Sequence, residues 1–510
     1  MSAPAPYVEL DASALRASIL SGERTPQRAV AEAFERIDAV DGELKAFLTT
    51  ERAWAEERAR TLEAELAAGA SPGPLFGVPV ALKANMCHEG FETNCASRIL
   101  EGWRAPYTAT FVQRLVEAGA IPIGTTNMDE FAMGSSSENS AFGATRNPWD
   151  TARTPGGSSS GSAVAVAAGM TPIALGSDTG GSVRQPAALC GIYGLKPTYG
   201  RVSRYGLVAF GSSLDQVSPF ARSVRDLELV LSAVSGTDAL DSTCRELPPF
   251  EASGDPGDEA ITLEGLRVGL PAEYMPDALD GGVRTAVEAA LAQLRSLGAE
   301  IVPISLPHSN VAIATYYVVA TAEASSNLAR YDGVRYGNRT AGDGTLNGMY
   351  AATREAGFGD EVKRRILLGT YVLSAGYYDA WYGRALKVRR LVQRDFEEAF
   401  ASVDVIAGPT APSPAFALGE KVDDPVAMYA SDVMTVPTSL AGLPGLSVPC
   451  GFVEADGRKL PVGLQLVAPA LAEARVLRVA RALEVARGPL ARPPAPGTPG
   501  TPDTLEEARS

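Results

Sequence analysis

Short apolar segments that are typical of buried strands alternate with helical segments along most of this 510-residue chain. Residues 76–82 alternate as a strand does, and the apolar run 173–175 leads directly into a glycine-rich loop. Apolar residues recur at helical spacing over 283–297, and a strand is expected over 301–306. Further strands are expected over 403–407, 446–450 and 460–467. Strands that alternate with helices in this way predict an α/β fold with a mixed, largely buried sheet.

The chain divides into three segments by composition. Residues 1–70 are expected to form an N-terminal helical segment packed on the core, in which Thr25 caps a helix that begins at Pro26. Residues 71–487 contain the alternating strands and helices and are expected to form the main domain. Residues 488–510 hold six prolines and little that could pack, which predicts a disordered tail.

The scarcity of histidine restricts the chemistry open to the chain. His88 and His308 are its two histidines, and neither stands in a paired spacing typical of metal ligands, so we expect no metal site. A Ser-His-Asp triad would need one of these two residues. Both are interpreted as polar loop residues, and an enzyme of this composition is expected to move protons with another side chain.

Cysteine usage and charge indicate the compartment and the partners. Five scattered cysteines fit reduced thiols in the cytoplasm better than a disulfide framework. The N-terminal residues lack a basic stretch followed by an apolar run, and no segment is long enough to span a bilayer, so neither a signal peptide nor a membrane span is expected. The net charge of −15 disfavours extensive contact with nucleic acid, whose phosphates require lysine and arginine.

Two clusters of glycine and serine, at 155–162 and 178–186, carry the strongest functional signal. Each alone could be a flexible loop or a backbone anion-binding site, although the chain has no Gly-Lys-Ser/Thr phosphate loop. A serine nucleophile needs a base within hydrogen-bond reach, and lysine is the obvious substitute where histidine is scarce. Lys83 follows the apolar strand 76–82 and has no carboxylate beside it in sequence, so burial could keep its amine neutral.

Lys83, Ser158 and Ser182 occur in the order and spacing of the amidase signature family, with gaps of 75 and 24 residues. The segments 77–83, 155–159, 178–186 and 191–198 also resemble that family's motifs. The resemblance implies the amidase signature fold, which is a large mixed twisted β-sheet flanked by helices on both faces. It also identifies residues 71–487 as the catalytic domain.

The same resemblance implies a Ser-Ser-Lys triad. Ser182 would attack the amide carbonyl and carry the acyl group. Ser158, preceded by a cis peptide bond, would shuttle the proton, and Lys83 would be the final base and acid. The oxyanion hole would be formed by the backbone N–H groups of Thr179, Gly180 and Gly181.

Two positions depart from the family pattern. Ala84 stands where the family often has aspartate, and Ser160 replaces a common glycine. Both changes concern the hydrogen bonds around the lysine and the first serine, and neither removes a triad atom.

Further segments resemble one branch of the family, the A subunits of bacterial glutamyl-tRNA(Gln) amidotransferases. These segments are 127–142, 323–337, 362–370, 376–380 and 440–449. The resemblance implies that the chain hydrolyses glutamine and passes ammonia to a B subunit, in a heterotrimer with a C subunit. The B subunit would bind the charged tRNA, ATP and Mg²⁺ and would amidate Glu-tRNA(Gln), Asp-tRNA(Asn) or both. No cofactor or metal is therefore expected in this chain.

A glutamine pocket must bind an α-carboxylate and an α-ammonium group. The resemblance offers the guanidinium of Arg365 for the carboxylate and Asp432 for the ammonium, with Tyr316 or Tyr317 nearby. Other interpretations of these residues stay open, because a basic run such as 363–365 is usually a solvated helix face and tyrosine pairs usually serve packing. Two other functions also stay open: a stand-alone hydrolase of small amides and a non-catalytic anion-binding module.

Overall fold

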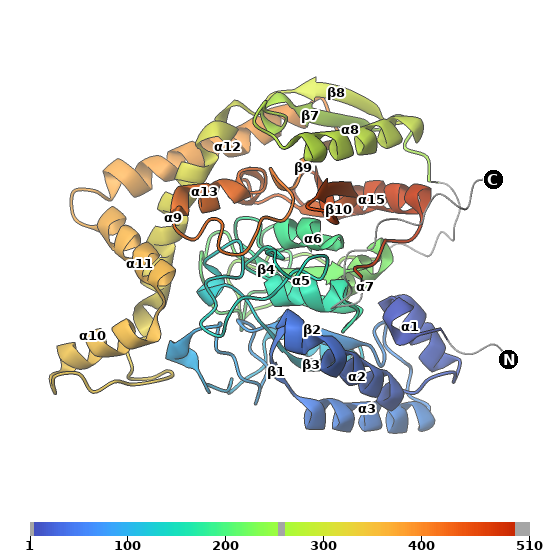
Figure 1. The fold of residues 1–510 in the computed structure, drawn as a ribbon, viewed down its shortest axis with the longest axis horizontal. Coiled ribbons are helices and arrows are strands. Elements are labelled where there is room, and N and C mark those ends of the chain that lie inside the picture. Colours follow the sequence, from blue (N-terminus) through green and yellow to red (C-terminus); the bar gives the residue numbers. More distant parts are fainter. Residues whose placement is uncertain (1–4, 253–260, 495–510) are drawn as a thin grey trace.

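The computed structural model describes residues 5–252 and 261–494, and the eleven strands within those ranges form one mixed sheet. The strands cross the sheet in the order β1-β3-β2-β4-β6-β5-β10-β11-β9-β7-β8 (Figure 1). Their bounds are β1 (Phe47–Thr50), β2 (Pro79–Lys83), β3 (Ile121–Thr126), β4 (Ile173–Asp178), β5 (Tyr193–Lys196), β6 (Gln216–Ala221), β7 (Arg267–Pro271), β8 (Glu300–Ile304), β9 (Val405–Pro409), β10 (Gly445–Ala455) and β11 (Arg458–Val467). The predicted α/β fold with a mixed sheet is confirmed, and each predicted strand lies in this sheet.

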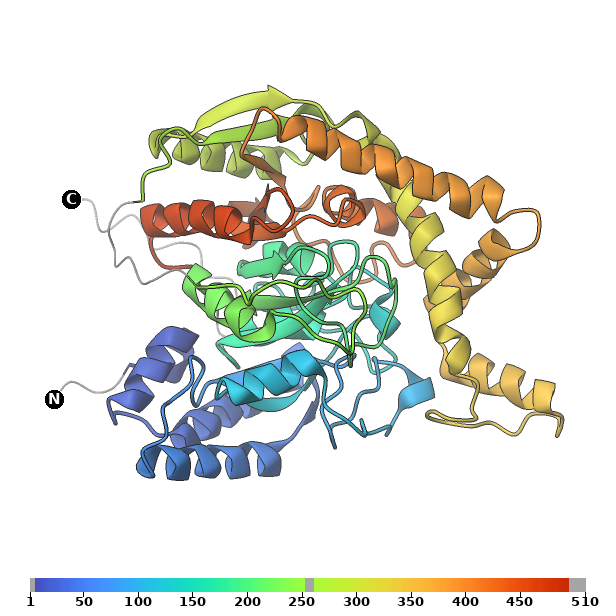
Figure 2. The ribbon, with the colours of Figure 1, turned by 180° about the vertical axis from the view of Figure 1, so that it is seen from behind.

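Helices cover both faces of the sheet, as expected. Alternate residues of β2 enter different apolar clusters, with Ala81 on one face and Val80 and Leu82 on the other. The first cluster includes Phe34 of α2 (Pro26–Leu44), and the second includes Phe111 of α4 (Thr110–Glu117). Figures 1 and 2, which view the molecule from opposite sides, show α2 and α5 in front of the sheet and α4 and α7 behind it.

The remaining helices connect these strands or extend beyond them. No helix among the described residues is both long and apolar enough to cross a membrane. Their bounds are α1 (Ala12–Leu20), α3 (Arg52–Ala67), α5 (Ser160–Ala167), α6 (Arg184–Cys190), α7 (Val224–Val234), α8 (Gly281–Ser296), α9 (Ala312–Asn327), α10 (Leu346–Gly357), α11 (Asp360–Leu373), α12 (Arg384–Ala399), α13 (Pro425–Tyr429), α14 (Val436–Leu440) and α15 (Glu473–Arg487).

The N-terminal segment is helical except for one strand that the sequence did not reveal. The Thr25 hydroxyl accepts a hydrogen bond from the Arg28 N–H, so α2 begins at Pro26 with the predicted cap. Residues 47–50, however, form β1, which pairs antiparallel with β3 at the edge of the sheet. This strand has four residues and no alternation of buried and exposed side chains, so its partner strand determines its conformation. The larger part of the predicted tail, 495–510, lies outside the described residues.

A helical arm, residues 312–399, projects beyond the sheet at the left of Figure 1. Helices α11 and α12 pack on α9, whereas α10 packs on the 3-10 turn Arg98–Leu100. The close approach of α11 to α9 requires Gly369, where a Cβ would overlap the backbone carbonyl of Thr321. The arm returns to the sheet at both ends. It therefore brings two distant parts of the sequence, the regions of residues 316 and 365, to one side of the sheet.

The two histidines differ from the prediction that both are polar loop residues. His88 does lie in a loop, but it is buried against Trp54 and Phe91, with ring centroids 4.8 and 4.3 Å away. Burial lowers the pKa of His88 to about 4. His308 lies in a short 3-10 turn, and its Nδ1 is 2.7 Å from the Asp395 carboxylate of α12. Each histidine thus contacts another element, His88 through its ring and His308 through the Asp395 carboxylate.

Candidate active site

Lys83 is the last residue of β2 and is fully buried at the carboxyl-terminal end of that strand. Its Nζ lies 2.7 Å from Ser158 Oγ, 2.8 Å from Ser159 Oγ and 2.9 Å from Ser177 Oγ. Ser177 lies near Lys83 because β4 runs parallel to β2, so the carboxyl-terminal ends of the two strands lie side by side. The structure therefore brings the predicted lysine and the first predicted serine into direct contact.

The environment of Lys83 favours the neutral amine. Burial lowers the pKa of Lys83 to about 7, although the negative charges of Asp129, Asp178 and Asp215 oppose that shift. Within the described ranges the amine contacts hydroxyl and carbonyl oxygens, and no carboxylate forms a hydrogen bond or ion pair with it. Lys83 can consequently exchange a proton near neutral pH, as a general base must.

The hydroxyl protons around Lys83 can be assigned from their partners. Ser159 Oγ donates to the Ser177 carbonyl at 3.1 Å, so it accepts from the lysine. Asn85 Nδ2 donates to Ser177 Oγ at 3.0 Å. A neutral amine has two hydrogens and one lone pair. If these two hydrogens go to Ser159 and Ser177, the lone pair is left to accept the proton of Ser158.

Ser158 is held in a loop that leads into α5. The peptide bond between Gly157 and Ser158 is cis, as the resemblance implied. The Gly157 N–H donates to Gln185 Oε1 at 3.0 Å, and the Ser158 carbonyl accepts from the Asp129 N–H at 3.2 Å. A Cβ at position 157 would overlap the Asp129 carboxylate, so only glycine fits there.

Ser182 lies in the turn between β4 and α6, at the accessible end of the cluster. It is 8% exposed, whereas Lys83 and Ser158 are fully buried. Its carbonyl accepts a hydrogen bond from the Ser159 N–H at 3.2 Å, which joins its loop to the Ser158 loop. A substrate could thus reach Ser182 while the lysine stays shielded from water.

The glycines before Ser182 allow a close approach of other elements. A Cβ on Gly180 would lie 2.8 Å from the Tyr316 hydroxyl, and one on Gly181, where φ is +144°, would overlap Thr435 Oγ1. Thr435 Oγ1 donates to the Gly180 carbonyl at 2.6 Å, which fixes the orientation of the peptide unit. Among the hydrogen bonds of the described residues, none is donated by the Gly180 or Gly181 N–H, so both can serve an oxyanion.

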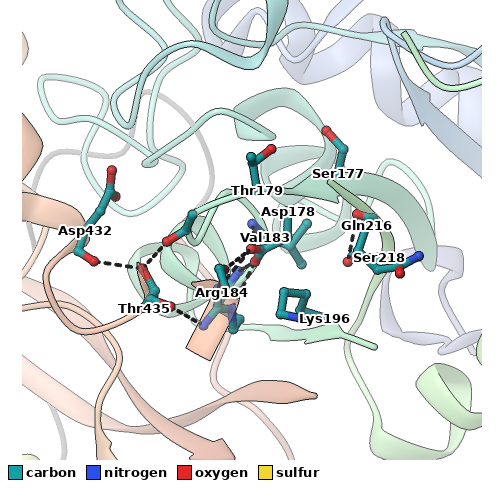
Figure 3. Close-up of polar contacts among 12 residues, drawn as sticks. Ser177, Asp178, Thr179, Val183, Arg184, Lys196, Gln216, Ser218, Asp432 and Thr435 are labelled. Carbon is teal, nitrogen blue, oxygen red and sulfur yellow. Dashed lines mark hydrogen bonds and ion pairs between the residues drawn. The ribbon is translucent and has the colours of Figure 1, made fainter. Parts of the chain in front are cut away.

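A buried ion pair between Asp178 and Arg184 holds the turn between β4 and α6 in place. Arg184 donates from Nε and Nη2 to the two oxygens of Asp178 at 3.0 and 2.9 Å, and both side chains have no exposed surface. Arg184 also donates to the Thr435 carbonyl at 2.9 Å (Figure 3). It donates to Gln465 Oε1 at 2.6 Å as well. The arginine lowers the pKa of Asp178 against the effect of its burial. The turn is consequently held between the sheet and the segment around residue 435.

Removal of the Asp178 carboxylate should therefore destabilise the fold. An Asp178→Ala variant leaves the charge of Arg184 buried without compensation, and we expect a loss of about 3–5 kcal/mol in the free energy of unfolding. Urea denaturation followed by circular dichroism measures this. Glu397→Ala, which breaks an exposed pair with Arg390, is the control and should leave the midpoint unchanged. Equal tolerance of both changes would contradict the anchoring role.

The predicted pocket residues gather on the open side of the turn. Arg365 of α11 is buried, with its guanidinium 5.1 Å from the ring centre of Tyr317. Asp432 is buried too and accepts from Ser135 Oγ at 2.5 Å. Burial raises the pKa of Asp432 to about 7, while the Ser135 hydrogen bond and the charge of Arg365 oppose the shift. Tyr316 lies against Gly180 in the turn before Ser182. Burial raises the pKa of the Tyr316 hydroxyl, and the charges of Arg365 and Asp432 shift it in opposite directions, so both groups lie near it.

The structure separates Arg365 from its basic neighbours. Lys363 and Arg364 are partly exposed, as on a solvated helix face, but Arg365 points inward and donates from Nε to Glu361 at 2.7 Å. Tyr429 donates to the same oxygen at 2.8 Å and stacks on Tyr317 with centroids 3.9 Å apart. Within the described residues the guanidinium forms this one hydrogen bond, which leaves its terminal nitrogens for a ligand.

Sequence reasoning missed several residues of this site. Ser159 and Ser177 surround Lys83, and Glu361 and Tyr429 orient Arg365. Glu361 could have been predicted from the sequence, because it precedes Arg365 by four residues on a helix and residues at this spacing face each other. Ser177 and Tyr429 come from segments whose closeness depends on strand pairing and on the path of the arm.

A buried lysine among serines, beside glycine N–H groups open to an oxyanion, is suited to acyl transfer from an amide or an ester. The Amidase family model matches residues 28–477. The A subunit of the glutamyl-tRNA(Gln) amidotransferase from Geobacillus kaustophilus is 56% identical over 90% of this chain and 93% of its own length. Its counterpart from a Picosynechococcus species is 53% identical over 92% and 97%. The chain belongs to the amidase family, and within it to the A subunits of glutamyl-tRNA(Gln) amidotransferases.

Solved structures agree with this placement. The crystal structure of the glutamyl-tRNA(Gln) amidotransferase A subunit from Thermotoga maritima matches with a TM-score of 0.76 and 41% identity, over 95% of this chain and 96% of that one. A peptide amidase from Stenotrophomonas maltophilia matches with a TM-score of 0.80 and 31% identity, over 97% and 100%. The expected amidase signature fold is therefore confirmed.

Proposed function

We propose that this chain is the glutaminase subunit of a tRNA-dependent amidotransferase, which hydrolyses glutamine to glutamate and ammonia. The observation that carries the proposal is the buried Lys83 amine, whose pKa is about 7 and which contacts the Ser158 hydroxyl. The loop of Ser158 is in turn hydrogen-bonded to Ser182. A base of that pKa can activate a hydroxyl at physiological pH without histidine. The identity to amidotransferase A subunits supports glutamine as the amide.

In the proposed reaction Ser182 Oγ attacks the carboxamide carbon of glutamine. Its proton passes to Ser158 Oγ as the Ser158 proton passes to Lys83 Nζ. The N–H groups of the turn at 179–181 stabilise the oxyanion. The C–N bond breaks, ammonia leaves with a proton returned by the same route, and water then hydrolyses the glutamyl ester on Ser182.

Glutamine would be recognised by its two charged groups. The terminal nitrogens of Arg365 would bind the α-carboxylate in bidentate fashion, and Asp432 would bind the α-ammonium group. The Tyr316 hydroxyl lies beside Gly180, and the Tyr317 ring supports the guanidinium. The bound zwitterion would lower the cost of burying these opposite charges, since each group meets a counter-ion.

The ammonia would be used outside this chain. We propose that B and C subunits complete a heterotrimer in the cytoplasm, and that the B subunit binds charged tRNA, ATP and Mg²⁺ and amidates Glu-tRNA(Gln), Asp-tRNA(Asn) or both. The acidic composition of this chain, with a net charge of −15, fits an arrangement in which the B subunit makes most tRNA contacts. This chain itself would need no metal or cofactor.

Ammonia release tests the proposed function. The chain, purified with its companion subunits, should release ammonia from glutamine in preference to simple aliphatic or aryl amides, and more so with ATP and charged tRNA. Brisk hydrolysis of simple amides without glutamine turnover would instead identify a stand-alone amidase. A chain that binds anions but hydrolyses no amide would be a non-catalytic module.

The pocket assignment predicts a change in KM. Arg365→Lys keeps the charge but loses the planar pair of donors, so we expect KM for glutamine to rise about 10- to 100-fold while kcat changes little. Arg394→Lys is the matched control, because it makes the same change at an exposed position of α12, where the partner is Glu398 and no residue of the pocket is involved. Steady-state glutaminase kinetics measure both. An unchanged KM in Arg365→Lys would exclude a carboxylate contact at this residue.

A further inference from the structure

The turn between β4 and α6, which carries Ser182, has a second buried support besides the ion pair of Asp178 and Arg184. Thr179 directly follows β4, and its Oγ1 donates to Oδ1 of Asp215 at 2.7 Å, in the loop that leads into β6. Both side chains are buried. Figure 3 shows the Thr179 side chain pointing away from Arg184, as expected for consecutive residues at the end of a strand. The start of the turn is thus held from two sides.

The hydrogen bonds of Asp215 use both of its carboxylate oxygens. Oδ1 accepts from Thr179 Oγ1 and from the Gly211 N–H at 3.0 Å, and Oδ2 accepts from the Phe210 N–H at 2.9 Å. An asparagine has one acceptor oxygen and a donating NH₂ group, so it would set its NH₂ group against one of these backbone N–H groups. The surroundings of this residue therefore require a carboxylate.

The loop that contains Asp215 is attached to the helical arm. The Glu323 carboxylate of α9 accepts from the Ser213 N–H at 2.9 Å. Arg389 of α12 donates to Ser213 Oγ at 2.7 Å and to the Ser213 carbonyl at 2.9 Å. The arm that carries Arg365 thus fixes this loop as well, so Asp215 is an acceptor whose position is set by its surroundings.

The turn needs such a support because of its two glycines. Gly180 and Gly181 have no side chain to restrict their backbone, yet their N–H groups must point at one site to stabilise an oxyanion. The Thr435 hydroxyl holds the Gly180 carbonyl from one side, and Thr179 joins the turn to β4 on the other. Rotation of the backbone at Thr179 would move both N–H groups, and a displacement of about 1 Å can cost about 10²-fold in rate.

We propose that Asp215 is a positioning residue for the oxyanion hole and acts by fixing the side chain of Thr179. The inference rests on the proposed function, which supplies the amide whose oxyanion the turn stabilises. Asp215 itself would touch no atom of the substrate. Because the oxyanion forms only after attack on the carbonyl carbon, loss of this support should lower kcat and leave KM nearly unchanged.

Thr179→Val tests the positioning role, because valine has nearly the same shape as threonine but no hydroxyl. We expect kcat for glutamine to fall about 10- to 100-fold, with KM within about threefold of the wild type. Thr179→Ser, which keeps the hydroxyl, should recover most of that loss. Thr353→Val is the matched control, because Thr353 of α10 is also buried and bonds to the Thr340 backbone, away from the site. It should keep the wild-type kcat.

A double-mutant cycle tests whether Asp215 acts through Thr179. The chain, purified with its companion subunits, is compared as Asp215→Asn, as Thr179→Val and as the double variant. The double variant should lose no more kcat than the more impaired single variant. Losses that multiply would overturn the inference, and so would a wild-type kcat in Thr179→Val or equal losses in Thr179→Val and Thr353→Val. The threonine variants decide the question if Asp215→Asn does not fold.

A simple amide separates failure of this inference from failure of the proposed function. A wild-type chain that hydrolyses a simple amide and not glutamine would contradict the proposed function. The same variants are then compared with that amide as substrate. A loss of kcat in Thr179→Val that Thr179→Ser recovers would still support the positioning role of Asp215, and an unchanged kcat would overturn it.

Discussion

Replacing Ser182 with alanine is expected to lower glutamine hydrolysis by about 10³- to 10⁶-fold. The hydroxyl is the attacking group in the proposed reaction, and no other serine of the cluster is exposed enough to take its place, because Ser158 and Ser159 are fully buried. Release of glutamate and ammonia from glutamine measures the loss. The far-ultraviolet circular dichroism should not change, since the Ser182 carbonyl, and not its side chain, bonds to Ser159.

Ser160→Ala is the matched control for the nucleophile. Ser160 lies in the other glycine-serine cluster, is fully buried and forms only long hydrogen bonds of 3.4 Å to Asn127 and Thr145. This variant should retain activity within about tenfold. Full activity in Ser182→Ala, or equal losses in the two variants, would exclude Ser182 as the nucleophile.

Replacing Lys83 with methionine is expected to lower kcat by about 10³-fold or more. Methionine has a similar shape but cannot accept the proton of Ser158, so the serine pair would lack a base. Binding of glutamine should be nearly unchanged, because Lys83 is buried behind the serines. Single-turnover kinetics and equilibrium binding of glutamine separate the two effects. A variant that binds and still turns over at the wild-type rate would contradict the base assignment.

The pH dependence provides a second measurement of Lys83 that needs no variant. Lys83 must be neutral to act as a base, and burial lowers its pKa to about 7, so kcat should rise as the pH increases through 7 and level off above it. Asp432 must be ionised to bind the ammonium group and its pKa is also about 7, so its titration should appear in KM. His88, whose pKa is about 4, titrates below this range. A kcat that does not vary between pH 5.5 and 8 would contradict the assignment.

The parts of this molecule that depend on local pattern could be predicted from the sequence. The strand that ends at Lys83 and the helix cap at Thr25 follow from local pattern, and the proposed Lys83–Ser158–Ser182 triad rests on a recognisable motif. The strand β1 could not be predicted, since it exists only through pairing with β3. The same applies to the partners of Lys83, because Ser177 becomes its neighbour through the parallel pairing of β2 and β4.

The two histidines illustrate a second limit. Their scarcity directed attention to lysine as a candidate base, but the prediction that both are polar loop residues did not describe their surroundings. His88 is buried in an aromatic cluster and His308 pairs with Asp395 across 87 residues of sequence. Contacts of this kind depend on tertiary packing, and neither the neighbouring residues in the sequence nor the composition predicts them. The Glu361 support of Arg365, in contrast, follows from helical spacing.

The central claim is that Ser182 attacks glutamine, and covalent labelling tests it most directly. The chain, with its companion subunits, is incubated with the diazoketone analogue of glutamine, 6-diazo-5-oxo-norleucine, and its peptides are analysed by mass spectrometry. We predict one label per chain, on Ser182, prevented by excess glutamine and absent from Ser182→Ala. Labelling of a different residue in step with the loss of glutaminase activity, with Ser182 unmodified, would contradict the account.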